Sequence, residues 1–393
     1  MYDFDKVKSR VGTGSIKWDF CSEHFNSDNL IPLWVADMDF ETAPEIKNAI
    51  VKRAEEGIFG YTEPIDSFYE SLINWYREYH DIEIKKEWIL AASTLVLALH
   101  VIIETFVKKD EKVIVQIPVY HQFIKSIEDN DIEAIESPLK LNGLKYEMDF
   151  EDFEEKIIHN NVSMFILCNP QNPVGRVWNK EELGKLALIC KKHNVLVVAD
   201  EIHGDLIFKG YKHESFLKFK DVLDEKLILI NSLTKTFNIA GLQLGNVIIP
   251  NEELRKKYMN NIERKGLSKA SLFGIVASEA GYRYGHNWLK ELIEYIEENK
   301  NYFTKFVNKN IKPLKVIDSE ATYLLWIDCR NLNMSDEELE NFIINKARLG
   351  VNFGTSFGNC GSGFIRVNIG CPRIILGDAM SRLKEAIDEL ELR

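Results

Sequence analysis

Short, continuous runs of apolar residues recur through the middle of the chain, and polar residues follow each run. The runs are Val113–Ile117, Met164–Cys168, Val195–Ala199 and Leu227–Ile230. Continuous rather than alternating apolar positions are typical of strands that are buried on both faces, as in a parallel sheet. The pattern therefore predicts a core of buried parallel strands.

Helical patterns separate these runs. The clearest is Asn179–His193, in which Asn179 can cap the helix and Glu182 follows three residues later, as in a capping box. Ser93 or Thr94 can cap a second helix. Alternating strands and helices predict an α/β fold with right-handed crossovers. Ligands of such sheets bind beyond the carboxyl ends of the strands, where the polar residues stand.

The pattern changes after about Gly285. A long charged helix comes first, and a C-terminal segment with two strands and a helix between them follows. We expect a large domain of residues 44–285 and a smaller α+β domain of residues 286–393, against which residues 1–43 pack. The expected elements of the smaller domain are a helix from Trp288 to about Val307, strands Ala321–Asp328 and Phe364–Ile369, and a helix Asp336–Leu349.

Length and charge narrow the classes of protein. A chain of 393 residues suits two domains, and 45% hydrophobic residues can form a sizeable core without metals or disulfides. The net charge of −12 argues against nucleic acid and anionic membranes as main partners. Six cysteines without zinc-like spacing predict reduced, buried thiols and no metal site. Charged residues are spread through positions 1–10, which therefore have no apolar signal-peptide core, and no apolar run could span a bilayer. We expect a cytoplasmic protein.

Lys235 is the strongest candidate for chemistry. It stands among the hydroxylic residues Ser232, Thr234 and Thr236, directly after the apolar run 227–230. A single lysine is usually a solvated surface charge. At the end of a buried strand, however, desolvation can keep the amine partly unprotonated, so that it can form a Schiff base.

Three other residues follow predicted strands. Asp200 ends the Val195–Ala199 run; an isolated aspartate is more often a helix cap, but a pocket carboxylate can also keep a pyridinium nitrogen protonated. His203 is either a structural histidine or a hydrogen-bond partner of Asp200 or of a ring hydroxyl. Asn172 lies in the rigid turn N-P-Q-N-P-V-G-R and can present its amide to a bound ring.

The order of these motifs is specific. N-P-x-N-P-x-G, then D-E-I-H, then S-x-x-K-T-F-N-x-A-G-L resembles the fold-type I pyridoxal-phosphate enzymes of aminotransferase class I/II. Four more stretches resemble the cystathionine β-lyase and cystalysin subgroup of the MalY and PatB type: Trp34–Phe40, Phe59–Thr62, Pro118–His121 and Arg366–Arg373. The resemblance covers nearly the whole chain. It implies a large domain with a mainly parallel seven-stranded sheet between helices, plus a smaller α+β domain.

The resemblance also implies pyridoxal 5′-phosphate as cofactor and a role for each matched residue. Lys235 would bind the cofactor as a Schiff base and act as the catalytic base. Asp200 would pair with the ring nitrogen, and Asn172 and His203 would lie at the ring 3-oxygen. Tyr120 would stack on the ring and take part in catalysis.

The remaining implied contacts concern the phosphate, the substrate and the neighbouring subunit. Ser232, Thr94 and Leu95 would hold the phosphate at a helix N-terminus. Tyr61 would reach the phosphate of the other subunit, which makes a homodimer the active unit. The implied substrate contacts are Arg366, which would clamp the α-carboxylate, together with Asn172 and Ala36.

The chain departs from the family pattern in two places. Ser93 and Thr94 stand where relatives usually have a glycine, and Gln243 stands where many aminotransferases have a phosphate-binding arginine. We expect a β-lyase that cleaves cystathionine or a related cysteine S-conjugate to a thiol, pyruvate and ammonia. An aminotransferase is the alternative, and a regulatory protein that binds pyridoxal phosphate is an alternative of another class. A nicotinamide dehydrogenase is disfavoured because no G-x-G-x-x-G follows a strand.

Overall fold

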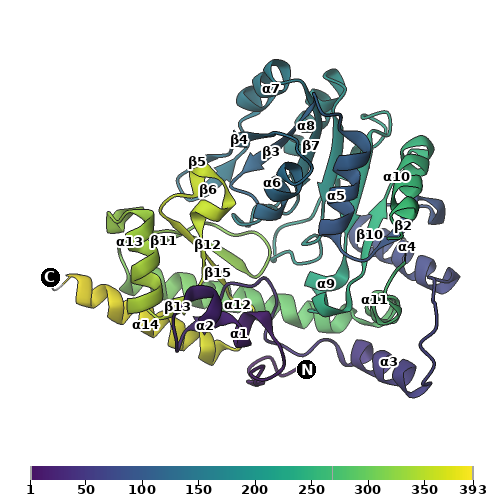
Figure 1. Ribbon diagram of the computed structural model, residues 1–393. Helices are drawn as coiled ribbons and strands as arrows, with labels where there is room; N and C mark the ends of the chain where they lie inside the picture. The colour runs from purple at the N-terminus through teal and green to yellow at the C-terminus, as the bar shows by residue number, and fades with distance from the viewer. Residues whose placement is uncertain (1, 268, 392–393) are drawn as a thin grey trace.

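A seven-stranded sheet forms the centre of the molecule in the computed structural model, which describes residues 2–267 and 269–391 (Figure 1). The outermost positions of the expected smaller domain, 1 and 392–393, lie outside the described residues. The strand order is β2-β10-β9-β8-β7-β3-β4, and only β10 runs antiparallel to its neighbours. The strands are β2 (Ile89–Ala92), β3 (Lys112–Ile117), β4 (Ala134–Pro138), β7 (Val162–Cys168), β8 (Leu196–Asp200), β9 (Leu227–Asn231) and β10 (Gly245–Ile248).

Helices cover both faces of this sheet (Figure 1). Successive strand residues point to opposite faces, so Phe165 and Leu167 enter one core and Met164 and Ile166 enter the other. Both cores are apolar, which is why the strands have continuous apolar sequences. The helices of this part are α3 (Pro44–Glu55), α4 (Asp66–His80), α5 (Leu95–Phe106), α6 (His121–Glu128), α7 (Phe150–His159), α8 (Lys180–Lys192), α9 (Leu233–Thr236), α10 (Glu252–Arg264) and α11 (Leu272–Tyr284).

The expected helix caps are confirmed. Asn179 and Glu182 form the capping box of α8: the side chain of each accepts a hydrogen bond from the backbone N–H of the other. Thr94, rather than Ser93, caps α5, because its Oγ1 accepts a hydrogen bond from the Leu97 amide at 3.1 Å. The start of α5 is therefore fixed beside the carboxyl ends of the strands.

A second, antiparallel sheet has the order β11-β12-β15-β14, and α12 packs against α14 beside it. The strand predicted from Ala321 begins only at Leu324, whereas the long helix is confirmed. The elements are α12 (His286–Asn310), β11 (Lys315–Val316), β12 (Leu324–Asp328), β14 (Asn352–Phe353), β15 (Phe364–Asn368) and α14 (Arg373–Glu391). A hairpin of β5 (Lys140–Asn142) and β6 (Lys145–Glu147) forms a separate two-stranded sheet.

The predicted helix Asp336–Leu349 is wrong at its end. The α-helix α13 (Asp336–Asn341) continues only as a wider turn to Lys346. Arg348 then adopts a left-handed backbone with φ 53°, which ends the helix. Leu349 and Gly350 form the short strand β13, which pairs in parallel with β1 (Ile31–Pro32). The N-terminal segment, with α1 (Ile16–Asp19) and α2 (Cys21–Phe25), thus joins this part of the molecule.

No helix within residues 2–267 and 269–391 is long and apolar enough to cross a membrane.

Candidate active site

A cavity of about 260 Å³ lies at the carboxyl ends of the central strands. It collects residues that the sequence motifs singled out, although they come from separate elements. Most of the predicted site residues line it: Ala36, Thr94, Leu95, Tyr120, Asn172, Asp200, His203, Ser232 and Lys235. Arg366 and Tyr61 are not among the lining residues. The departures from the family pattern, Ser93 and Gln243, do line the cavity.

Lys235 lies on the short helix α9, directly after strand β9. Ser232 caps this helix by accepting a hydrogen bond from the Thr234 amide at 3.1 Å. The Lys235 Nζ donates a hydrogen bond to the Ala36 carbonyl oxygen at 2.7 Å. Burial lowers the pKa of Lys235 to about 8, although the nearby Asp37 carboxylate raises it. The amine is therefore partly unprotonated near neutral pH and can act as a nucleophile or a base.

Asp200 is the last residue of β8 and is 7% exposed. Its Oδ1 accepts a hydrogen bond from the Ile202 amide at 3.0 Å. Burial raises the pKa of Asp200 to about 7, against the lowering effects of that amide and of Lys235. A carboxylate in this position needs a cationic partner to stay fully ionised at neutral pH. The site thus fits a ligand that brings a protonated nitrogen.

His203 is also buried at the cavity. Its Nδ1 has no hydrogen-bond partner among the described residues, and no hydrogen bond joins its ring to Asp200 there. Burial, with Lys235 and Arg366 nearby, lowers the pKa of His203 to about 3. The imidazole is therefore neutral, so it can offer one N–H donor and one acceptor to a ligand.

The start of α5 supplies an anion site. The first N–H groups of a helix lack partners within the helix, and Thr94 and Leu95 place this end in the cavity. Ser232 Oγ donates to the Leu244 carbonyl at 2.5 Å, so this hydroxyl is already engaged. Lys235 is the only lysine or arginine among the described lining residues, and Gln243 leaves the anion site without a guanidinium.

Arg366 lies on β15 and is fully buried beside Asn172. Its Nη1 donates to Asn172 Oδ1 at 3.1 Å, and its Nη2 donates to the Trp34 carbonyl at 3.0 Å and to Asn352 Oδ1 at 2.7 Å. Its Nε has no partner, and no carboxylate of the described residues pairs with it. Burial lowers the pKa of Arg366 to about 10. A buried cation with a free donor fits an incoming carboxylate.

Tyr61 lies on the irregular segment between α3 and α4. Its side chain is 103% exposed, and it makes no contact with the cavity of its own chain. Its neighbours Ile58, Phe59 and Ile65 are exposed as well. Within a single chain, Tyr61 therefore lies outside the candidate site.

Sequence reasoning missed two side chains that hold the segment around Ala36 beside the site. The Tyr323 hydroxyl donates to the Ala36 carbonyl at 2.9 Å, beside the Lys235 amine. Tyr323 lies in an apolar run and in no motif, so the sequence carries no signal for it. Asn238 holds the backbone of Met38 at both ends of its amide, and its place in S-x-x-K-T-F-N was a signal.

These features fit one kind of ligand. Asp200 offers a carboxylate to a cationic ring, His203 offers a neutral imidazole, and the start of α5 offers amides to an anion. Lys235 can react with a carbonyl group of such a ligand. Pyridoxal phosphate combines a protonatable ring nitrogen, an aldehyde and a phosphate, so the residues present fit it. Among the described residues, no cluster of histidine, cysteine, aspartate and glutamate side chains could hold a metal ion.

Known proteins resemble the chain over its whole length. Cystathionine β-lyase PatB of Bacillus subtilis (strain 168) is 38% identical over 98% of this chain and 100% of its own. A pyridoxal-phosphate-bound putative aminotransferase of Clostridium difficile 630 superposes with a TM-score of 0.96 at 42% identity, covering 98% of this chain and 100% of its own. Cystalysin of Treponema denticola, which contains pyridoxal 5′-phosphate, has a TM-score of 0.95 at 34% identity, over 99% and 100%.

The family described as aminotransferase class I and II matches residues 28–383 of the chain. The fold, with its mainly parallel seven-stranded sheet, is that of the solved structures above. The chain therefore belongs to the aminotransferase class I and II family, where it is similar to the cystathionine β-lyases and cystalysin.

Proposed function

We propose that the protein is a pyridoxal-phosphate-dependent carbon–sulfur β-lyase that cleaves cystathionine or a related L-cysteine S-conjugate to a thiol, pyruvate and ammonia. The observation that carries the proposal is the set of buried, unpaired charges of Asp200, Lys235 and Arg366 around one site. The full-length similarity to a protein named cystathionine β-lyase supports the choice of reaction.

In this proposal the cofactor lies in the cavity between β8, α9 and the start of α5. Asp200 pairs with the ring nitrogen, and Asn172 and His203 bind the ring 3-oxygen. Tyr120 would cover the ring face, and Lys235 would hold the cofactor at its aldehyde carbon. When bound, pyridoxal phosphate supplies an electron sink for the bonds at the substrate α-carbon.

The proposed phosphate contacts are backbone amides and a hydroxyl rather than a charged side chain. The amides at Thr94 and Leu95 border the proposed phosphate position, and the Ser232 hydroxyl would turn from the Leu244 carbonyl to the phosphate. Ser93 and Gln243 offer neutral hydrogen-bonding groups there instead of a bare glycine and a guanidinium. Backbone amides and the helix dipole thus supply the attraction that a cation supplies elsewhere.

The chain's own groups bind the substrate and move the proton. Arg366 pairs with the α-carboxylate through its free Nε, and Asn172 and Ala36 border the same space. Once the substrate amine had taken its place at the aldehyde carbon, the freed Lys235 Nζ would take the α-proton as general base, because burial lowers its pKa to about 8. The bond between the β-carbon and sulfur would then break, and the sulfur would take up a proton and leave as a thiol. Water would hydrolyse the remaining aminoacrylate to pyruvate and ammonia.

We also propose the arrangement of the whole enzyme. A large domain of residues 44–285 carries the cofactor, and residues 1–43 with 286–393 form the smaller domain. The active unit is a homodimer in which Tyr61 reaches the partner's phosphate; the exposed apolar side chains around it support a protein interface there. A cytoplasmic location agrees with the free cysteines, of which all but Cys360 are buried.

An aminotransferase is the second candidate, because a similar solved structure is named a putative aminotransferase. One preparation separates the two functions. Pyruvate and free thiol released from L-cystathionine are measured beside amino transfer from several amino acids to 2-oxoglutarate. We expect rapid pyruvate release. Rapid transfer with negligible pyruvate would establish the aminotransferase and reject the lyase.

A further inference from the structure

Residues 34–40 form a strap that passes beside the active site without helix or strand structure. Its backbone carbonyls accept hydrogen bonds from side chains of distant elements. The Trp34 carbonyl accepts from Arg366 Nη2 at 3.0 Å, and the Ala36 carbonyl accepts from Lys235 Nζ at 2.7 Å. The proposed carboxylate clamp and the proposed base thus both take an acceptor from the same segment.

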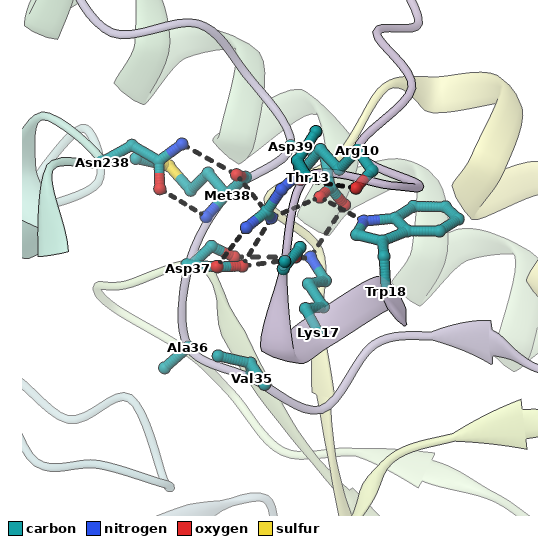
Figure 2. Close-up of polar contacts among 12 residues, drawn as sticks. Arg10, Thr13, Lys17, Trp18, Val35, Ala36, Asp37, Met38, Asp39 and Asn238 are labelled. Atoms are coloured by element: carbon teal, nitrogen blue, oxygen red, sulfur yellow. Dashed lines mark hydrogen bonds and ion pairs between the residues drawn. The ribbon is translucent and has the colours of Figure 1, made fainter. Parts of the chain in front are cut away.

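Two asparagines hold the strap on the side of the site. Asn368 Nδ2 donates to the carbonyls of Val35 and Asp37, both at 2.6 Å. Asn238 donates to the Met38 carbonyl at 2.8 Å and accepts from the Met38 amide at 2.9 Å (Figure 2). With the contacts above, each carbonyl from Trp34 to Met38 has a side-chain donor, so side chains replace the sheet or helix that the segment lacks.

A cluster of charges holds the strap on its other side (Figure 2). Arg10 makes a bidentate pair with Asp37 at 2.9 and 2.6 Å, and its Nη1 also donates to Asp39 Oδ1 at 2.9 Å. Lys17 Nζ, which is wholly buried, donates to Asp39 Oδ2 at 2.8 Å, and Trp18 Nε1 donates to Asp39 Oδ1 at 2.8 Å. Two cations therefore meet two carboxylates of the strap.

Arg10 itself stands on a structured loop. The Thr13 hydroxyl donates to the Arg10 carbonyl at 2.6 Å. Asp19 accepts from the amides of Gly12 at 2.8 Å and Gly14 at 2.7 Å, and both glycines have a left-handed backbone, with φ of 78° and 74°. The guanidinium is therefore presented from a fixed base, although Arg10 does not line the cavity.

We propose that Arg10 is a positioning residue that holds the strap in place through its pair with Asp37. In the held arrangement the strap's carbonyls orient Lys235 and Arg366; the inference rests on the roles proposed for those two side chains. The charged groups that face the Lys235 amine are Asp37 from the strap, Arg366 from β15 and Asp200 from β8. Asp37 thus links the charge cluster to the base.

The direct test is the mobility of the strap in the full-length, cofactor-free chain. Arg10→Ala is compared with Arg330→Ala, which removes a guanidinium from another bidentate pair, with Asp328 at 2.9 and 2.8 Å. Hydrogen exchange of peptides covering residues 34–40 is followed by mass spectrometry. We expect Arg10→Ala to speed exchange about tenfold or more, the effect of losing one charge-assisted hydrogen bond. Arg330→Ala leaves exchange there unchanged.

Two further measurements connect the strap to the site. At high pH, where the amine is unprotonated, an amine reagent should label Lys235 faster in Arg10→Ala than in the wild-type chain, because the strap no longer covers it. In the holoenzyme, Arg10→Ala should raise KM for L-cystathionine about tenfold, more than it lowers kcat, since Arg366 loses an orienting acceptor. Arg10→Lys keeps one ion pair and should recover part of each effect.

The outcomes separate this inference from the proposed function. Unchanged strap exchange and Lys235 labelling in Arg10→Ala, with only a lower unfolding temperature, would overturn the positioning role. If Arg10→Ala fails to fold, the same comparison is made with Asp37→Asn, which keeps the side-chain shape and removes the charge. Faster exchange and labelling in Arg10→Ala would support the positioning role even if the wild-type enzyme released no thiol from L-cystathionine. That second result would reject the lyase alone.

Discussion

The molecule buries charged side chains in two neighbouring regions, and within the described part of the chain they form ion pairs in one region but not in the other. Around the cavity, Asp200, Lys235 and Arg366 form no ion pair with a described residue, and burial moves each pKa toward the neutral form. In the cluster on the strap, Lys17 and Asp39 pair at 2.8 Å. There, burial alone would raise the pKa of Asp39, but Lys17, Trp18 and Arg10 lower it below its usual range.

This difference separates structural charges from functional ones. A buried charge without a partner costs stability, so a fold keeps one only where a ligand later supplies the partner. A buried charge with partners holds the chain in one arrangement and is poorly placed to bind anything else. The unpaired set therefore marks the binding site, and the paired set marks what holds the site in place.

The largest expected effect is on the unpaired lysine. Lys235→Ala should abolish turnover, since no other described lysine lines the cavity. Borohydride reduction of the holoenzyme followed by peptide mapping should label Lys235 in the wild type and nothing in the variant. Lys300→Ala is the control, because burial lowers the pKa of Lys300 too, yet it lies at Phe208 outside the cavity. A label on another lysine would falsify the assignment.

Asp200→Asn should leave the fold intact and lower turnover by about three orders of magnitude, because the ring loses its anionic partner. The same change should stabilise the cofactor-free chain at pH 8. The folded pKa of about 7 lies above the ordinary value of 3.8, so this group's contribution is favourable at low pH and is lost as pH rises through that window. Urea unfolding at pH 5 and pH 8 measures the effect. Near-normal turnover with saturating cofactor would reject the proposed role.

Asp39→Asn should have the opposite effect on stability. It removes the nearer carboxylate of the buried Lys17 and leaves only Asp37 Oδ1 at 3.8 Å, which costs about 3 kcal/mol of unfolding free energy. Because the folded pKa of Asp39 lies below 3.8, the wild-type contribution is present at pH 7 and is lost as pH falls through the aspartate range. Urea unfolding of the cofactor-free chain at pH 7 measures the loss. A change below about 1 kcal/mol, the size of a surface pair, would remove the contrast between the regions.

The smallest effect concerns the link between the regions. In the cofactor-free chain, the pH midpoint for labelling the Lys235 amine should lie near 8, below an ordinary lysine. Asp37→Asn should lower that midpoint by about one unit, since the Asp37 carboxylate favours the charged amine. The midpoint of Lys300 in the same digest is an internal control. A midpoint of Lys235 that Asp37→Asn leaves unchanged would show that the strap's charge does not reach the base.

Sequence patterns predicted the central sheet because its strands are buried on both faces and therefore read as continuous apolar runs. They also predicted the cavity residues at the ends of strands, such as Asp200, the last residue of β8, and Ser232, which directly follows β9. The end of the helix at Arg348 was missed, because a left-handed residue other than glycine or asparagine carries no clear signal. The position of Tyr323 was missed because its hydroxyl contact with Ala36 depends on tertiary structure alone.

The contacts of the strap have a consequence for how the protein is made. The carbonyls of Val35 and Trp34 accept hydrogen bonds from Asn368 and Arg366, so the strap near the beginning of the chain cannot be completed until β15, near the end, is present. During translation, the apolar core around β8 and β9 can form before β15 leaves the ribosome, because β9 ends at Asn231 and β15 begins only at Phe364. The nascent chain can thus carry Lys235 in a folded sheet while its surroundings are still incomplete. The active site would then become complete only after β15 has been synthesised.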